Sequence, residues 1–330
     1  MIGRIQSEIT RFKEVLSKGQ IGDCRVNQVC EYGYVLEPKD PKPLPNDKTI
    51  GLTVMAVTHG NEVGGIAVLN EFLWLINRGR ISIDMRIGVI LGNPWASMSE
   101  QRFVDRDLNR SFGRKNDETH EDKRARDLEK ILGETLFLLD IHQTIEKSDT
   151  GFFIFPYKPE NFAFARKVRL RIPIVTHWGG GFSKDGACTD EYVNSCGGTG
   201  ITLELGQKGF DSYHVSLGVQ GVLNAYEGAC DSVVGAESVE DDYSPEIYTW
   251  GQIVNFSSDE MSLDEGWYNF KAVEEGQRLG VDGSKIIKAE CNGKILFPKY
   301  LRGNSKQRPA ELCRVMRRVD LAELESIPEE

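Results

Sequence analysis

Short apolar runs alternate with amphipathic stretches through the first two thirds of the chain. The mostly apolar runs at residues 52–57, 87–91 and 136–141 have the length and composition of strands buried on both faces of a sheet. Residues 66–76 carry apolar side chains three and four positions apart, which predicts a helix with one face on that sheet. The alternation therefore predicts an α/β fold, with a mixed, mostly parallel sheet flanked by helices.

The pattern changes character near residue 230. Before that point we expect helices at 118–132 and 213–226, strands at 173–176 and 200–205, and an edge or hairpin strand at 151–155. After it come an acidic stretch and then short β-rich segments, one of them at 267–270, which predict a small sandwich or barrel-like domain. The expected divisions are an N-terminal extension (1–45), a main catalytic domain (46–230), a linker (231–246) and a β-rich domain (247–330).

Charge and composition exclude several classes of function. The formal net charge is -10 and the pI is near 5.2, which argues against a nucleic-acid partner because phosphate binding needs clustered Lys and Arg. No stretch of about 18 uninterrupted apolar residues is present, and residues 1–18 mix charged with apolar positions, so we expect no membrane partner and a cytoplasmic protein. The seven cysteines are scattered without a C-x-x-C pair, which indicates reduced cysteines and no cysteine-based zinc site.

Two strand ends carry the residues that suggest a metal site. His59 follows the first buried strand with Glu62 three positions on, and His142 ends a second strand. Two histidines and one glutamate from neighbouring strand ends form the ligand set of a catalytic zinc, with the fourth position left for water. We therefore expect one Zn²⁺ per chain. The alternative for His59 alone is an ordinary loop histidine, because H-x-x-E also arises by chance.

A long loop between these strands is rich in arginine. Residues 102–110 contain three arginines and one asparagine, and long loops inside compact α/β domains are usually functional. Guanidinium groups bind carboxylates and stabilise oxyanions, which suits a hydrolase with an acidic substrate. Surface ion pairs with neighbouring aspartates are the alternative, and we prefer that alternative for Arg106 but not for Arg102, Asn109 or Arg110.

Glu204 is the single carboxylate in the apolar strand at 200–206. An ionised carboxylate loses its hydration on burial, so a lone one is costly unless it is paired or functional. We expect Glu204 to be the general base that takes a proton from the attacking water and passes it to the leaving nitrogen. Asp140 either orients His142 or is structural. His177, Cys188 and Cys196 are open candidates for the pocket lining.

Taken in order, these motifs resemble the succinylglutamate desuccinylase and aspartoacylase family, relatives of zinc carboxypeptidases. The matching residues are His59-Gly60-Asn61-Glu62, Gly92-Asn93-Pro94, Arg102, Asp107-Leu108-Asn109-Arg110, Asp140-Ile141-His142 and Leu203-Glu204-Leu205-Gly206. The resemblance covers about residues 50–230 clearly and the C-terminal region loosely. It implies a zinc carboxypeptidase-like fold, zinc bound by His59, Glu62 and His142, catalysis by Arg102 on the scissile carbonyl with Glu204 as base, and a substrate carboxylate held by Asn109 and Arg110.

The resemblance also bears on the substrate, which we expect to be a small N-acyl amino acid. The aspartoacylase branch has a further arginine upstream of its catalytic glutamate, whereas residues 189–200 contain none here. That difference favours N-succinylglutamate, cleaved to succinate and glutamate in the last step of an arginine-degrading route. The rival hypotheses are a zinc metallocarboxypeptidase acting on peptides and a catalytically silent binding protein. The β-rich domain could enclose the pocket or join subunits in a homo-oligomer.

Overall fold

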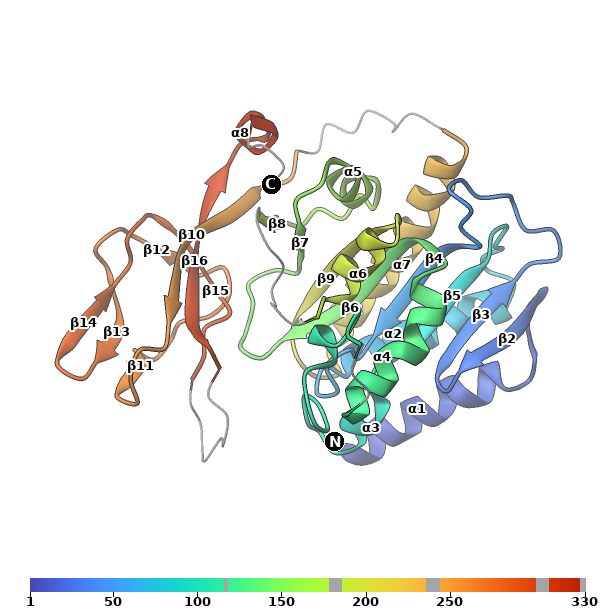
Figure 1. Cartoon of the computed structure of the whole chain (residues 1–330), viewed down its shortest axis with the longest axis horizontal. Helices are drawn as coiled ribbons and strands as arrows, with labels where there is room; N and C mark the ends of the chain where they lie inside the picture. The colour runs from blue at the N-terminus through green and yellow to red at the C-terminus, as the bar shows by residue number, and fades with distance from the viewer. Residues whose placement is uncertain (116–117, 178–185, 236–243, 301–308, 327–330) are drawn as a thin grey trace.

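The computed structural model describes residues 1–115, 118–177, 186–235, 244–300 and 309–326 (Figure 1). Its main feature is a sheet of thirteen strands. In sheet order they are β1 (Gln20–Ile21), β2 (Cys24–Cys30), β3 (Gly33–Glu37), β5 (Ile87–Leu91), β4 (Ile50–Ala56), β6 (Thr135–Thr144), β9 (Thr199–Gln207), β7 (Phe152–Pro156), β8 (Ile174–His177), β10 (Ile247–Asn255), β16 (Glu311–Val319), β15 (Gly293–Leu296) and β12 (Ala272–Val273).

The centre of the sheet is parallel except at the antiparallel pair β9–β7, which joins the larger parallel group to a second one of β7, β8 and β10, and both ends of the sheet are antiparallel. Strands β5, β4, β6 and β9 run parallel to one another, whereas β1, β2 and β3 join one side in antiparallel register. Every residue of β4, β5 and β6 is buried, as expected for strands covered on both faces. The predicted mixed α/β fold is confirmed.

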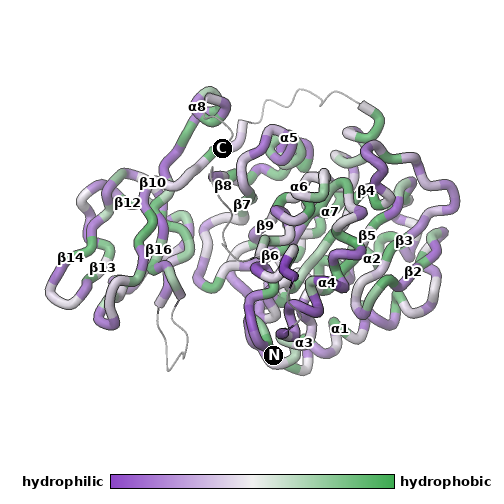
Figure 2. The backbone as a smooth tube through the Cα atoms, in the orientation of Figure 1, coloured by the Kyte–Doolittle hydropathy of each residue, from purple (hydrophilic) through white to green (hydrophobic). Residues whose placement is uncertain are grey.

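Helices cover both faces of this parallel centre. The helices are α1 (Ile2–Leu16), α2 (Gly64–Asn77), α3 (Pro94–Met98), α4 (His120–Leu132), α5 (Pro159–Lys167), α6 (Thr189–Ser195), α7 (Ser212–Val233), α8 (Leu321–Ser326) and the short 3₁₀ helix η1 (Leu108–Arg110). One core joins side chains of α1, α2, α5 and α7 to the sheet, and a second joins α4 and α6 to its other face. Hydrophobic segments gather in this interior (Figure 2). No described helix is long and apolar enough to span a bilayer.

The first 37 residues are part of the main sheet and core. Strands β1 to β3 extend the sheet, and α1 buries one face, formed by Ile5, Ile9, Phe12 and Leu16, against the larger core. The predicted N-terminal extension therefore packs onto the α/β part. Polar residues interrupt the apolar positions of β2, as is common near a sheet edge, and so no buried strand was predicted there.

The C-terminal region continues the same sheet. Strand β10 pairs with β8 in parallel, and β16, β15 and β12 follow it in antiparallel order. A second sheet of β11 (Met261–Leu263), β13 (Arg278–Asp282) and β14 (Lys285–Lys288) shares a core with these strands, as in a small sandwich. The expected β-rich character is present, and the outer strands project to one side of the α/β part (Figure 1).

Two predicted strands are corrected. Residues 267–270 form a turn with an isolated bridge, because the indole of Trp267 points into the core, where it donates to the carbonyl of Leu279. Strand β7, expected at an edge, lies inside the sheet between β9 and β8 because the C-terminal strands add beyond β8. In the predicted linker, α7 continues to Val233, and residues 236–243 lie outside the described residues.

Candidate functional site

The predicted metal ligands come together at the ends of β4 and β6. His59 Nδ1 lies 2.9 Å from one carboxylate oxygen of Glu62, and His142 Nδ1 lies 3.0 Å from the other. All three side chains are buried, and one ligand atom from each lies within 4.8 Å of the others. This donor set fits a divalent cation of the zinc type, which takes imidazole nitrogens and a carboxylate.

A carboxylate lies against the other ring nitrogen of each histidine. Asp140 Oδ2 is 2.9 Å from His142 Nε2, and Asp107 Oδ1 is 3.0 Å from His59 Nε2. The hydroxyls of Thr58 and Thr189 in turn donate to Asp140. Such partners fix the orientation of metal-binding imidazoles and leave the opposite nitrogen toward the centre. Asp140 therefore contacts His142, and Asp107 is a site residue to which the sequence analysis, although it included Asp107 in a family motif, gave no role at the metal site.

The turn after β4 explains part of the His59-Gly60-Asn61-Glu62 motif. Val57 has a positive φ of 52°, an unusual conformation for a β-branched residue, and its carbonyl accepts the NH of Asn93. Gly60 lies directly on α3, where an added Cβ would come within 2.5 Å of the backbone of Ala96. A side chain at Gly60 would push α3 or His59 out of place.

The electrostatic interactions within the cluster keep Glu62 ionised between the two imidazoles. Burial raises the pKa of Glu62, but His59 and His142 outweigh it and hold that pKa well below its usual range. Burial lowers the pKa of His142, but Asp140 and Glu62 outweigh burial and raise the pKa well above its ordinary value. Glu62 is thus held as a charged carboxylate, the form that binds a metal ion.

Arg102 lies at the edge of the cluster. One guanidinium nitrogen is 3.4 Å from Glu62, and another donates to Asp107 at 3.1 Å. About a third of the Arg102 side chain is exposed (33%), so it faces the opening of the site as well as the buried carboxylates. Burial raises the pKa of Asp107, but His59 and Arg102 outweigh it and hold that pKa well below its usual range.

The loop that carries Arg102 and Asp107 is held by Glu121, a residue of α4 that the sequence did not single out. Its fully buried carboxylate accepts four hydrogen bonds of 2.6–3.1 Å, from the side-chain amide of Asn93 and the backbone NH groups of residues 104–106. A buried carboxylate with this many donors is strongly fixed. Glu121 therefore positions the loop without reaching the metal cluster.

The two predicted substrate-binding residues lie in η1. Asn109 is buried, and its side-chain oxygen accepts the NH of Thr189 at 2.9 Å. The Arg110 guanidinium donates to the carbonyl of Asn109 and, at 2.9 Å, to the sulfur of Cys188. Cys188 therefore contacts a predicted site residue. Arg106 lies 3.7 Å from Asp122 of α4, a different aspartate from Asp105 and Asp107, the neighbours with which an ion pair was expected.

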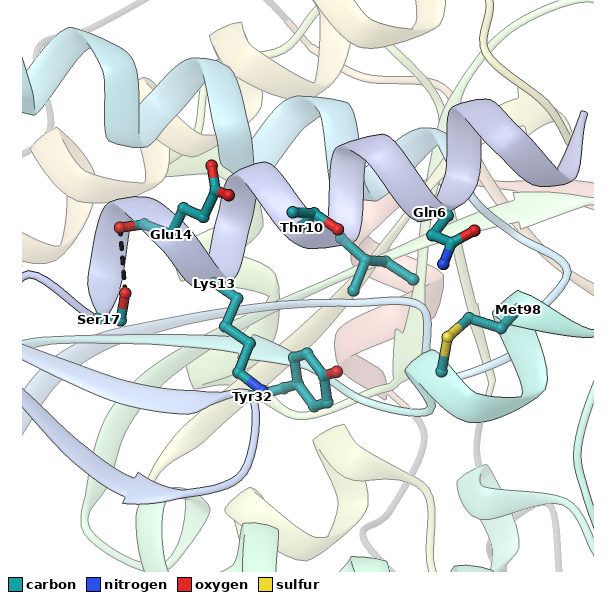
Figure 3. A pocket seen from close by; sticks show the side chains of 8 residues that line it. Gln6, Thr10, Lys13, Glu14, Ser17, Tyr32 and Met98 are labelled. Carbon is teal, nitrogen blue, oxygen red and sulfur yellow. Dashed lines mark hydrogen bonds between the residues drawn. The ribbon is translucent and has the colours of Figure 1, made fainter.

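The other open candidates lie elsewhere. The ring of His177 stacks on Trp250 at a centroid distance of 5.5 Å, and Cys196 caps the far end of α6. A cavity of about 450 Å³ lies along α1, lined by residues such as Lys13, Tyr32 and Met98 (Figure 3). None of the predicted site residues lines this cavity.

Glu204 lies beside His142, because the two residues are register partners in β9 and β6. The side chain is buried, and one carboxylate oxygen has no hydrogen-bond partner among the described residues. Burial, with repulsion from Glu62, raises the pKa of Glu204 to about 8. A carboxyl group with a pKa near neutrality can both accept and donate a proton.

Comparison with known proteins agrees with this geometry. A model of the succinylglutamate desuccinylase/aspartoacylase catalytic domain matches residues 48–225. The succinylglutamate desuccinylase of Ectopseudomonas mendocina is 26% identical over 276 residues, which cover 78% of this chain and 81% of that protein. The N-acyl-aromatic-L-amino acid amidohydrolase (carboxylate-forming) of Xenopus tropicalis is 32% identical over 124 residues, covering 34% and 39% of the two chains.

A solved structure has the same fold over nearly the whole chain. The X-ray structure of the succinylglutamate desuccinylase of Vibrio parahaemolyticus has a TM-score of 0.71 and 16% sequence identity, and the match covers 94% of this chain and 95% of the other. This match shows that the chain shares its fold with a solved succinylglutamate desuccinylase. The chain belongs to the succinylglutamate desuccinylase/aspartoacylase family, which confirms the resemblance drawn from its motifs.

Proposed function

We propose that this protein is a zinc-dependent hydrolase that cleaves the amide bond of a small N-acyl amino acid. The observation that carries the proposal is the buried His59, Glu62 and His142 cluster with Glu204 beside it, one of whose carboxylate oxygens has no hydrogen-bond partner in the part of the chain that the structure describes. His59, Glu62 and His142 would hold the ion. Bound there, zinc supplies a Lewis acid that polarises a carbonyl and lowers the pKa of water to roughly 7.

The protein side chains provide the proton transfers and the charge stabilisation. Glu204 takes a proton from the attacking water and delivers it to the leaving nitrogen, two tasks that its pKa of about 8 permits. Arg102, partly exposed at the edge of the cluster, donates hydrogen bonds to the oxygen that becomes negatively charged during attack. Asp140 and Asp107 keep the two imidazoles oriented throughout.

Asn109 and Arg110 hold a carboxylate of the substrate. The guanidinium of Arg110, which lies beside Cys188, can bind a carboxylate through two parallel hydrogen bonds. The positive charges of Arg102 and Arg110 favour an acidic substrate over an aromatic one. N-succinylglutamate, which bears three carboxylates, is the leading choice and would place the enzyme in arginine catabolism.

The wider assignment follows the same reasoning. The proposed division keeps a catalytic domain at 46–230, onto which α1 and β1 to β3 pack, and a β-rich domain after the proposed linker at 231–246, whose first residues still belong to α7. All seven cysteines are free, which supports a reducing compartment such as the cytoplasm. The expected partner is a small molecule, not a nucleic acid or a membrane, and the β-rich domain leaves a face for self-association in a homo-oligomer.

A substrate panel tests the proposal. The zinc-loaded protein is assayed with N-succinylglutamate, N-acetylaspartate, N-acyl aromatic amino acids and short peptides, with chelator-treated protein as the control. Zinc-dependent release of succinate and glutamate is the expected result. Cleavage of peptides alone would assign the protein to the carboxypeptidases, and bound zinc with no hydrolysis of any compound would favour a silent binding protein.

A further inference from the structure

The β-rich region is fastened to the loop that follows β6, the strand of His142. The side-chain amide of Asn269 donates to the carbonyls of Glu146 and Lys147, both at 3.0 Å, and its oxygen accepts the NH of Phe297 at 2.7 Å. Asn269 is buried, so these bonds are shielded from water. One side chain therefore ties the segment after β15 to the end of the catalytic strand.

An aromatic contact places that segment beside Glu204. Phe152 is the register partner of Glu204 in β7 and is fully buried. Its ring centroid lies 5.1 Å from that of Phe270 and 6.1 Å from that of Phe297. The chain that follows Phe297 thus leaves the β-rich region next to the proposed general base.

Lys299 is the charged residue of this segment. Its backbone NH donates to the carbonyl of Leu312 at 2.8 Å, so its position is fixed by β16. The charges that act on its ammonium are those of Arg102, Glu204, Glu62 and Glu311. Burial, with repulsion from Arg102, lowers the pKa of Lys299 to about 8.

The ammonium of Lys299 forms no hydrogen bond or ion pair with any residue that the structure describes, and it lies 5.4 Å from the ring centroid of Phe297. A partly buried cation that forms no ion pair is unfavourable. An anion that enters the site between Lys299 and the arginines would remove that cost.

We propose that Lys299 is a specificity-determining residue whose ammonium binds a second carboxylate of the substrate, one that Asn109 and Arg110 do not hold. This inference rests on the proposed function, which it deepens by naming the substrate class: N-acyl amino acids that carry at least two carboxylates. It also gives the β-rich region a role, because that region supplies the residue. Substrates with a single carboxylate would leave Lys299 unpaired.

Ligand binding tests this inference without requiring turnover. Calorimetry on the zinc-loaded full chain compares succinate with its monoamide succinamate, in the wild type, Lys299→Met, Lys299→Arg and the exposed control Lys288→Met. The expected result is that Lys299→Met weakens succinate binding at least about tenfold, while succinamate binding changes less than about threefold. Lys299→Arg and Lys288→Met should retain most of the succinate affinity.

Three results would overturn the inference: unchanged succinate binding in Lys299→Met, an equal loss for both ligands, or no preference of the wild type for succinate. Lys299→Gln replaces Lys299→Met if the methionine variant melts at a lower temperature than the wild type. Because the readout is binding and not turnover, an inactive wild type would contradict the proposed hydrolase function. The calorimetry would still decide whether Lys299 binds a carboxylate.

Discussion

Replacing one carboxylate oxygen of Glu121 should lower catalytic activity, although Glu121 does not contact the metal cluster. In Glu121→Gln, the amide oxygen can still serve two of the four donors, but the amide NH₂ then faces the other two, such as the NH groups of Asp105 and Arg106. Each hydrogen bond to a charged group contributes about 1.5–3 kcal/mol, so the loss of two is roughly 3–6 kcal/mol. The loop can avoid much of this cost by shifting, which moves Arg102 and Asp107.

The expected result of Glu121→Gln is a fall in kcat/KM of about 100-fold, which corresponds to about 3 kcal/mol of lost transition-state stabilisation. The fall should lie mainly in kcat, because Arg102 acts on charge that develops during the reaction. Bound zinc should be unchanged, since Glu121 contacts none of the three proposed ligands. Glu129→Gln, on the same helix and with a single exposed bond to the NH of Gly113, is the matched control.

The measurements are kcat and KM on the substrate identified by the panel, zinc content, and the free energy of unfolding in urea. A folded Glu121→Gln protein with activity within about twofold of the wild type would refute the positioning role. Loss of zinc in proportion to activity would instead mean that Glu121 supports the metal cluster. An equal loss in Glu129→Gln would point to a general weakening of α4.

Two further predictions concern Arg110 and Asp190. Arg110→Ala should raise KM about tenfold or more and lower kcat much less, because it removes a grip on an unreacting carboxylate; steady-state kinetics showing an unchanged KM would contradict that role. Burial raises the pKa of Asp190 to about 7 from an ordinary 3.8, so the folded state keeps a proton that the unfolded state loses, and stability falls as pH rises from about 4 to above 7. Asp190→Asn should remove that fall. Measured by urea unfolding of metal-free protein, the free energy of unfolding of the variant relative to the wild type should therefore rise by up to about 4 kcal/mol between pH 4 and pH 8. Parallel pH profiles of the two proteins would refute the assignment.

The sequence predicted the parts of the molecule whose pattern is local. Strands such as β5 are continuous apolar runs, and their buried positions follow from that run. The sequence also predicted that three residues form one site, because the carboxyl ends of neighbouring parallel strands share one edge of the sheet. These residues are His59, Glu62 and His142. Glu204 was identified because a charge inside an apolar strand is unusual.

The features that sequence reasoning missed depend on partners far away in the chain. Glu121 binds backbone NH groups, which every residue type offers, so nothing at residues 104–106 signals the contact. Lys299 is an ordinary lysine in a region without a motif, and only the fold places it near Glu204. The sequence at residues 267–270 looks like a strand because it is rich in aromatic residues. In the structure these side chains pack in the core, and the segment does not form a hydrogen-bonded strand.

The most direct test of the central claim is the turnover of Glu204→Gln at a zinc occupancy equal to that of the wild type. Glutamine keeps the shape of the side chain but cannot accept and return a proton. We predict full zinc binding, an unchanged fold and a fall in kcat of about 10²–10⁴-fold. Near-normal turnover at equal zinc content would contradict the assignment of Glu204 as the general base and with it the proposed mechanism.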